Sequence, residues 1–247
     1  MFRKLVAVEL LKIRRSLALL MLFAIPLMVV LLNFMILVKR NDLGNIDAKA
    51  WFFYWIGNTG IWSYFMMPLY VALITGLLNG QEHRNQTWRL MLTLPVSQLQ
   101  LFVVKGILAW LFVVCSTLVL MGATLLTIGA LILCGAAADG ALSIELVASI
   151  LGKVSVTCIP VLVIQHVISW RFQNLVLPLA VSVMATMGVQ QIGSSTYWVW
   201  YPWSYPAMAM LGSDVAKQQH AMMLAAVVGV ALLALSAVLL GRREVEN

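Results

Sequence analysis

Residues 81–105 read QEHRNQTWRLMLTLPVSQLQLFVVK. This short charged segment interrupts a chain that is otherwise almost continuously apolar, and the apolar stretches on both sides of it are long enough to cross a bilayer. A compact polar helix in such a place gains nothing from contact with lipid. The segment is therefore typical of a surface that is presented to a soluble partner.

The composition indicates an integral membrane protein. Hydrophobic residues make up 62% of the 247 residues and charged residues only 10%, against roughly 25% charged residues in a typical soluble domain. An unpaired backbone is so costly in lipid that the spans must be helices, and the alternating pattern of a transmembrane β-barrel is missing. We predict an all-α polytopic protein with one transmembrane domain, residues 1–247, and six spans at about residues 17–38, 57–79, 103–133, 150–170, 175–192 and 221–240.

The distribution of Lys and Arg predicts the orientation, because short cytoplasmic loops carry an excess of both. Six spans place both termini on one side, and that side carries eleven of the sixteen basic residues: Arg3, Lys4, Lys12, Arg14, Arg15, Arg84, Arg89, Lys105, Arg171, Arg242 and Arg243. The other side carries Lys39, Arg40, Lys49, Lys153 and Lys217. We expect both termini in the cytoplasm, and we interpret the net charge of +7 as contact with lipid headgroups, not with nucleic acid.

Residues 1–15 are expected to form an amphipathic helix ahead of the first span. One side of the helical wheel carries Phe2, Leu5, Val6, Leu10 and Ile13, and the other carries Arg3, Lys4, Arg14 and Arg15. Such a helix lies in the headgroup region, with its cations facing phosphates and water. The alternative is a plain positively charged flank that only determines the topology.

Within the charged segment, the sequence predicts a short helix at residues 82–94 and then a sharp re-entry into the membrane. Pro95 ends this helix. Ser97 begins the next helix in a capping box with Gln100, in which the serine accepts from a backbone N–H three residues on and the glutamine reaches back.

Prolines mark two other irregular places. Pro68 is expected to bend the second span. Residues 197–206, YWVWYPWSYP, are too broken by prolines to cross the membrane, and their aromatic rings are typical of a membrane–water boundary. We predict an interfacial or re-entrant hairpin on the outer side, before the sixth span.

No residue pattern in the chain indicates a catalytic centre. There is no GxxxxGK[ST] loop for nucleotide phosphates and no GxSxG nucleophile elbow. His83, His166 and His220 lack metal-ligand spacing, and no pair of carboxylates lies inside a span. We therefore predict that the chain is not an enzyme and holds no metal or cofactor, so that energy for uphill transport comes from another polypeptide.

Polar uncharged side chains inside the spans form a second set of candidates. As lining of a conduit between subunits we predict Asn33, Asn58, Thr59, Gln165, Gln190 and Gln191. Their side chains need polar partners in a membrane, and interhelical hydrogen bonds within one subunit are the alternative for each of them. His166, about one turn before Arg171, is expected near the cytoplasmic headgroups.

Four segments carry a resemblance to a known family. They are ELLKIRRS at residues 9–16, EHRNQTWR at 82–89 with LPVS at 94–97 and Lys105, RFQN at 171–174, and YPWSYP at 201–206. Through them the whole chain resembles the permease subunits of ABC-2 type ATP-driven exporters. In detail it is most similar to the lantibiotic-immunity branch, small permeases that help to clear antimicrobial peptides from a producer's membrane.

The resemblance implies a division of labour in a bacterial inner membrane. Permeases of this kind recruit a separate cytoplasmic ABC ATPase, two copies of which bind ATP and Mg, and a second permease, the same chain or a sister, completes the conduit. Residues 82–94 then correspond to the coupling helix that docks in the ATPase, and its contact residues are Glu82, His83, Arg84, Thr87, Trp88 and Arg89. Residues 1–15 correspond to the connecting helix, with Glu9, Lys12, Arg14 and Arg15.

We therefore predict the permease subunit of an ATP-driven exporter whose cargo is an amphipathic peptide such as a lantibiotic. Another ABC-2 cargo (a drug, an ion or a lipid-like molecule) is one alternative, and a membrane scaffold that recruits a signalling protein is another. A membrane-embedded enzyme would need converging acid, base or metal groups. The sequence leaves open the cargo and the choice between a homodimer and a heterodimer of permeases.

Overall fold

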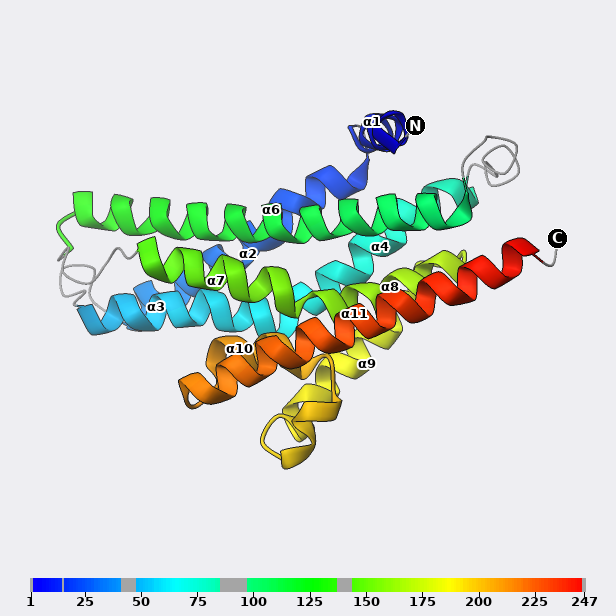
Figure 1. Ribbon diagram of the computed structural model, residues 1–247. Helices are drawn as coiled ribbons and strands as arrows, with labels where there is room; N and C mark the ends of the chain where they lie inside the picture. Colours follow the sequence, from blue (N-terminus) through cyan, green and yellow to red (C-terminus); the bar gives the residue numbers. More distant parts are fainter. Residues whose placement is uncertain (1, 15, 41–47, 85–96, 137–143, 246–247) are drawn as a thin grey trace.

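The computed structural model describes residues 2–14, 16–40, 48–84, 97–136 and 144–245, and every regular element within these ranges is a helix (Figure 1). In chain order the elements are α1 (Phe2–Ile13), α2 (Leu17–Arg40), α3 (Ala48–Ile61), the π-helical turn η1 (Trp62–Met66), α4 (Met67–Arg84), α6 (Gln98–Leu133), α7 (Ile144–Thr157), α8 (Ile159–Arg171), α9 (Val176–Ile192), the 3-10 helix η2 (Thr196–Trp200), α10 (Ser204–Leu211) and α11 (Val215–Val245). The all-α class predicted from the composition is confirmed for this part of the chain.

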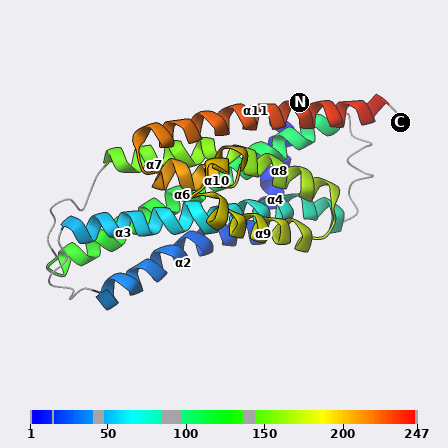
Figure 2. The same ribbon diagram turned by 90° about the horizontal axis from the view of Figure 1, so that it is seen from below.

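The long helices run along a common axis, and the two ends of the bundle differ (Figures 1 and 2). At one end, α1 lies across the bundle near the end of α4, the start of α6 and the end of α11. The opposite end holds the end of α2, the start of α3 and the end of α6. Both ends of the chain therefore lie at the same end of the bundle.

Helix α6, with 36 residues, is the longest element and packs against α2, α4, α7 and α8. Polar side chains connect it to its neighbours at buried positions. Ser116 Oγ donates to the Leu22 carbonyl of α2 over 3.1 Å, and the Trp62 indole N–H donates to Thr117 Oγ1 over 3.1 Å. Because lipid offers no hydrogen-bonding partners, such bonds between helices supply the partners that these polar side chains need.

The second predicted span contains a wide turn just before Pro68. In η1 the main-chain hydrogen bonds change from the α-helical to the π-helical pattern, and the Met67 N–H donates to the Trp62 carbonyl five residues earlier. Proline has no N–H with which to continue an α-helical ladder, and a π-turn is one way in which a helix accommodates such a break. The Pro68 carbonyl accepts from Ser182 Oγ over 2.8 Å, which ties α4 to α9.

The fourth predicted span, residues 150–170, consists of two helices and not one. Helices α7 and α8 meet at Cys158 with a bend of 42°, and α7 begins at Ile144, earlier than the sequence predicts. Pro160 stands in the first turn of α8, where its missing N–H costs no helical bond. The apolar run after Lys153 predicts one helix, because apolar composition carries no signal of a change in direction.

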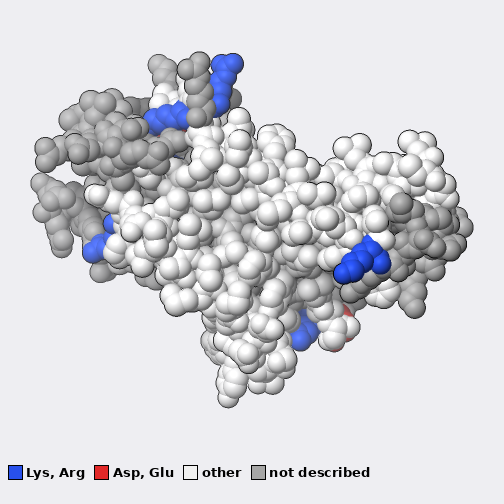
Figure 3. Space-filling model, turned by 180° about the vertical axis from the view of Figure 1, so that it is seen from behind, with Lys and Arg blue, Asp and Glu red and all other residues white. Residues whose placement is uncertain are grey.

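Four described helical segments are long and apolar enough to cross a membrane: Leu17–Lys39, Ala50–Gly80, Gln98–Leu133 and Val215–Leu240. The bent pair α7–α8 makes five. Helix α9 has 17 residues, about 26 Å at the helical rise, near the lower limit for a hydrocarbon core of about 30 Å. The sixth crossing therefore stays a prediction at this helix. Figure 3 shows a broad uncharged surface across the middle of the molecule, as contact with lipid requires.

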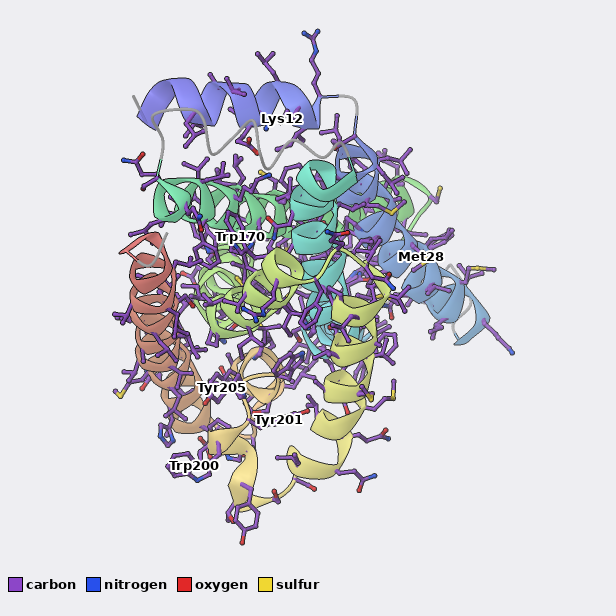
Figure 4. All side chains as sticks on the ribbon, turned by 90° about the vertical axis from the view of Figure 1, so that its right-hand side faces the viewer. Lys12, Met28, Trp170, Trp200, Tyr201 and Tyr205 are labelled. Atoms are coloured by element: carbon purple, nitrogen blue, oxygen red, sulfur yellow. The ribbon has the colours of Figure 1, made fainter. Side chains whose placement is uncertain are left out.

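Residues 196–211 form a lobe beside α9 and α11, built from η2 and α10 (Figures 1 and 4). Its two short helices are held by side-chain bonds to main-chain carbonyls. Tyr201 Oη donates to Ala185 over 2.7 Å, Tyr205 Oη donates to Val199 over 2.7 Å, and Ser204 Oγ donates to Trp198 over 2.8 Å. The segment is thus helical in two pieces, neither of which is long enough to span.

Candidate functional site

Helix α1 docks on the end of the bundle through a narrow stripe of side chains, with Lys12 on the same helix (Figure 4). Leu5, Glu9 and Ile13, each four residues apart, are buried. Leu10, also on the apolar side of the predicted wheel, is 51% exposed. The docked face is centred on Glu9, so one of its three buried side chains is charged, and the prediction that this helix lies in the headgroup region stays a prediction.

Glu9 joins two lysines in a buried ion-pair cluster. Glu9 Oε2 lies 2.9 Å from Lys105 Nζ of α6, and Glu9 Oε1 lies 2.6 Å from Lys12 Nζ. Lys105 is completely buried, and its ammonium also donates to the Leu78 carbonyl of α4 over 2.7 Å. One lysine therefore connects α1, α4 and α6, and the helical ladder of α4 contributes one of its acceptors.

The electrostatics of this cluster keep the carboxylate ionised. Burial by itself raises the pKa of Glu9, but the nearby Lys105 ammonium and the hydrogen bond from Lys12 together outweigh it, so that the pKa of Glu9 lies below its ordinary value of 4.5. Breaking a buried pair by removing one partner leaves an uncompensated charge and costs about 3–5 kcal/mol. The position of α1 against α6 therefore depends on the pairing of Glu9 with Lys105.

The cluster lies between α4 and α6, the two helices that residues 85–96 connect. Leu78 stands six residues before the end of α4 at Arg84, and Lys105 is in the second turn of α6. The predicted capping box at the start of α6 is confirmed: Ser97 Oγ accepts from the Gln100 N–H over 3.2 Å, and Gln100 Oε1 accepts from the Ser97 N–H over 3.4 Å. Residues 85–96 thus connect two helix ends whose relative position Lys105 helps to determine.

The predicted coupling residues fall partly on α4. Glu82, His83 and Arg84 belong to the last turn of this helix, so the helix predicted to begin at residue 82 continues α4 at its start. Thr87, Trp88 and Arg89 lie outside the described residues, as does Arg15. Arg14, the first residue after α1, is exposed.

A second polar cluster connects α4, α6 and α8 next to the first. Asn79 Nδ2 donates to His166 Nδ1 over 3.1 Å and to Ser169 Oγ over 2.7 Å, and His166 Nε2 donates to the Phe102 carbonyl over 3.0 Å. His166 is 1% exposed and its ring lies against Phe102 and Trp170. It is therefore a connector inside the bundle, and its expected depth near the cytoplasmic headgroups stays a prediction.

The family model of the ABC-2 family transporter proteins matches residues 5–189, about three quarters of the chain, including both clusters. The chain belongs to the ABC-2 transporter family. No curated protein matches it, and no solved structure matches it. Membership makes the chain a membrane component of a transport system, in agreement with its apolar helices.

Two residues of this ABC-2 transporter protein have roles that the sequence pattern does not assign. In the sequence, Lys105 is only the basic residue that ends the charged segment, although a lysine eight residues into an apolar helix is itself a signal of a buried partner. Asn79 does not stand out in the sequence at all. The acceptor on Leu78 has no sequence signal, because it is a main-chain carbonyl.

The predicted lining residues of the ABC-2 protein do not gather on one surface of the subunit. Asn33, Asn58, Thr59 and Gln165 are buried, whereas Gln190 and Gln191 are exposed near the end of α9. Asn58 Nδ2 donates to Thr124 Oγ1 of α6 over 3.3 Å, and Thr59 Oγ1 donates to the Trp55 carbonyl of its own helix over 2.9 Å. Interhelical bonding, the alternative for these residues, is thus observed for Asn58, whereas Thr59 bonds within its own helix.

A cavity of about 550 Å³ lies between α6, α8 and α11. Its lining is almost entirely apolar and includes Gly106, Leu162 and Ala234, and His166 borders it. Ile107 and Val230, at its rim, are 45% and 66% exposed, so the cavity reaches the lipid-facing surface. Such a space can accept an apolar chain from the side, within the hydrocarbon region.

Proposed function

We propose that this chain is the membrane-spanning permease subunit of an ATP-driven ABC-2 exporter and that it is coupled through residues 82–94 to a separate cytoplasmic ATPase. The observation that carries the proposal is the buried bond of Lys105 to both Glu9 and Leu78. It joins the amphipathic helix α1 to the two helices that flank the charged segment. A force applied to that segment therefore reaches three helices at once.

The sequence of this chain indicates which partner proteins it needs. The polar sequence of residues 81–89 suits contact with a soluble protein, and the sequence holds no nucleotide-binding loop. Two ATPase copies bind ATP and Mg, and a second permease, identical or a sister, completes the conduit. The setting is a bacterial inner membrane with both termini in the cytoplasm. The shared end of the two termini (Figure 1) and the distribution of Lys and Arg along the sequence support it.

The mechanism is a rocking of packed helices. ATP binding closes the ATPase dimer and draws the coupling segments together, and the ion-pair cluster passes the displacement from α4 and α6 to α1. The bend at Cys158 and the π-turn at Trp62–Met66 are the places where helices change direction most easily. Cargo is released only if it contacts the two states differently.

The cargo that the site supports best is an amphipathic peptide such as a lantibiotic. The apolar cavity between α6 and α11 suits its apolar side chains, and the buried amides of Asn33 and Gln165 have hydrogen-bonding groups without partners in the described part of the chain. Reconstituted transport assays with a lantibiotic, a cationic drug and a labelled lipid distinguish the cargo classes. Export of only the drug or only the lipid would reject the peptide and leave the exporter function in place.

Cysteine labelling tests the side on which the coupling segment lies. The chain offers its own control, because Cys134 is exposed at the opposite end of the bundle. In a variant with Thr87→Cys, a membrane-impermeant maleimide should label Cys134 in intact cells and should label the introduced thiol only after permeabilisation. Labelling of the introduced thiol in intact cells would reject the proposal.

Copurification tests the coupling itself. Glu82→Gln and Arg84→Gln should weaken both binding of the ATPase and stimulation of its hydrolysis, with membrane insertion unchanged. Lys39→Gln, an exposed charge at the other end of the bundle, is the matched control. Unchanged binding and hydrolysis in both variants would contradict the coupling assignment.

A further inference from the structure

An apolar groove lies between α1, α2 and α6, and its volume is about 730 Å³. It is separate from the cavity beside α8 and α11, because the two spaces share no lining residue. On α6, Gly106 lines the cavity, whereas Leu108 and Cys115 line the groove. With 3.6 residues per turn, these positions stand on opposite faces of the helix. The groove is therefore independent of the space proposed for cargo.

The groove has a buried floor and an open rim. Leu22 of α2 and Leu108 and Phe112 of α6 line it and are buried. Leu19 and Leu111 also line it but are exposed, so one side of the groove is open to the surroundings of the bundle. Both α2 and α6 are long and apolar enough to cross a membrane. Because lipid surrounds such helices, the apolar group available to fill the groove is an acyl chain.

Helix α1 contributes an apolar face and one cation to this groove. Ala7, Leu10 and Leu11 line it, and Arg14 lines it directly after the helix ends. These residues are three or four positions apart, so they share one face, which is turned away from the docked side chain of Glu9. Leu11 is 68% exposed and Arg14 is exposed beside it. Exposed leucines next to a cation are suited to an amphiphilic ligand and not to water.

The cation stands at the end of the first candidate span. Arg14 comes three residues before the apolar segment Leu17–Lys39. The Ser16 N–H donates to the Ile13 carbonyl over 2.9 Å, and the chain passes from α1, which lies across the end of the bundle, directly into α2 (Figure 4). From residue 108 to residue 115 the groove follows α6 for about 10 Å at the helical rise. The cation is thus at one end of the span and the apolar lining continues along the bundle.

We propose that this groove binds an anionic phospholipid of the surrounding membrane, with an acyl chain along residues 108–115 and the headgroup phosphate on Arg14. The planar guanidinium presents a fork of N–H donors that matches two phosphate oxygens. Its charge favours a lipid with a net negative headgroup over a zwitterionic one. Because the lining comes from α1, α2 and α6, a bound lipid contacts all three helices. The proposal depends neither on the cargo nor on the ATPase.

Lipid titration followed by native mass spectrometry tests the headgroup contact. The full-length protein in a neutral detergent is titrated with phosphatidylglycerol and, in parallel, with phosphatidylcholine that has the same acyl chains. We expect Kd for phosphatidylglycerol to be about fivefold lower than for phosphatidylcholine, and Arg14→Gln should remove this difference. Arg14→Lys should keep most of it. Arg171→Gln is the matched control, because Arg171 is exposed at the end of α8, is predicted on the same side of the membrane and does not line the groove.

A substitution in the apolar lining tests the position of the acyl chain. Ala7→Phe fills the groove from an exposed position on α1 and should raise Kd for both lipids about tenfold, since excluding two methylene groups has an effect of that size. The headgroup variant changes the preference between the two lipids, whereas this variant weakens both. The Tm of the lipid-free protein should be the same in the parent and in all four variants, because each substituted side chain is exposed.

Photo-crosslinking locates the bound lipid independently of affinity. Phosphatidylglycerol with a diazirine in its acyl chain should cross-link to residues 108–115 of α6 and to residues 7–14, and Ala7→Phe should reduce these cross-links. Cross-links confined to other helices, equal affinity of the parent for both lipids, or an equal change in Arg171→Gln would overturn the proposal. Displacement by millimolar inorganic phosphate would overturn it too. Lipid bound to the monomer but excluded from a dimer in the same spectrum would assign the groove to a second copy of this chain.

Discussion

Glu9 Oε2 on α1 lies 2.9 Å from Lys105 Nζ on α6, in a place where both side chains are almost completely buried. The two residues are far apart in the chain, and α2, α3, η1 and α4 lie between them. Because the same ammonium donates to Leu78 of α4, the pair links α1 to both helices next to the predicted coupling segment. Its removal should therefore affect both stability and coupling.

Removing one partner of this pair should destabilise the protein more than replacing both. Lys105→Met leaves the buried Glu9 with only the partly exposed Lys12 as a partner among the described residues. We expect a loss of up to about 3–5 kcal/mol in the free energy of unfolding, whereas the double variant with Glu9→Met should lose much less. Denaturant or thermal unfolding in detergent measures both. Lys39→Met, on an exposed site, should stay within about 0.5 kcal/mol of the parent. Additive losses in the double variant would contradict a direct pairing.

The same pair predicts a dependence on pH. The folded-state pKa of Glu9 is depressed below 4.5, so its contribution to stability is fully present above the unfolded pKa and is lost as the pH falls through the folded pKa. The difference in Tm between the parent and Glu9→Gln should be constant from pH 7 to about pH 5.5 and should shrink below about pH 4.5. A difference that is unchanged down to about pH 3 would show that Glu9 does not act through its charge.

Gly229 should tolerate no side chain, because α11 passes closely over the bend between α7 and α8. A Cβ at this position would lie 2.8 Å from Ile159 Cγ2 and 3.3 Å from Ile159 Cβ. Gly229→Ala should cost about 1–3 kcal/mol in the free energy of unfolding. Gly152→Ala on α7, where a Cβ meets nothing within 4 Å, should instead stabilise the helix by up to about 1 kcal/mol. The same sign for both variants would reject the close approach.

The cluster around His166 should behave as one hydrogen-bonded unit. His166→Phe leaves the Phe102 carbonyl without its side-chain donor and removes one acceptor of Asn79. We expect a loss of about 1 kcal/mol for this variant and a similar loss for Asn79→Leu, with the double variant losing less than the sum. A double-mutant cycle of Tm values in detergent measures the coupling. Full additivity would mean that the two side chains do not depend on each other.

The charged segment shows how far sequence reasoning can go at the candidate site. The capping box of Ser97 and Gln100 is predictable because it depends on residues three positions apart. The role of Lys105 depends on α1, almost one hundred residues earlier in the chain, and on a main-chain carbonyl of α4. Neither partner has a local signal, so the sequence marks Glu9 as a site residue without showing the cluster to which it belongs.

The spans show the same division. A run of apolar residues determines that a helix forms, because lipid leaves the backbone no other partner, and hence α2, α6 and α11 lie close to where the sequence predicts them. The bend at Cys158 is not predictable in this way, because apolar composition does not indicate where a helix changes direction. The docked face of α1 is not predictable for a related reason: the wheel separates apolar from basic residues, and nothing in it indicates that an ion pair buries Glu9.

By itself, then, the sequence determined the class of the protein, its membrane setting, its helical segments and the charged interruption after α4. Those features depend on the solvent and on neighbours within a few residues. Only the tertiary structure decided that Lys105 joins three helices, that His166 is an internal connector and that Lys153 of α7 donates to Gln218 of α11. Such pairings depend on how distant helices pack, because the free energy of a buried charge or amide is set by the partner it finds.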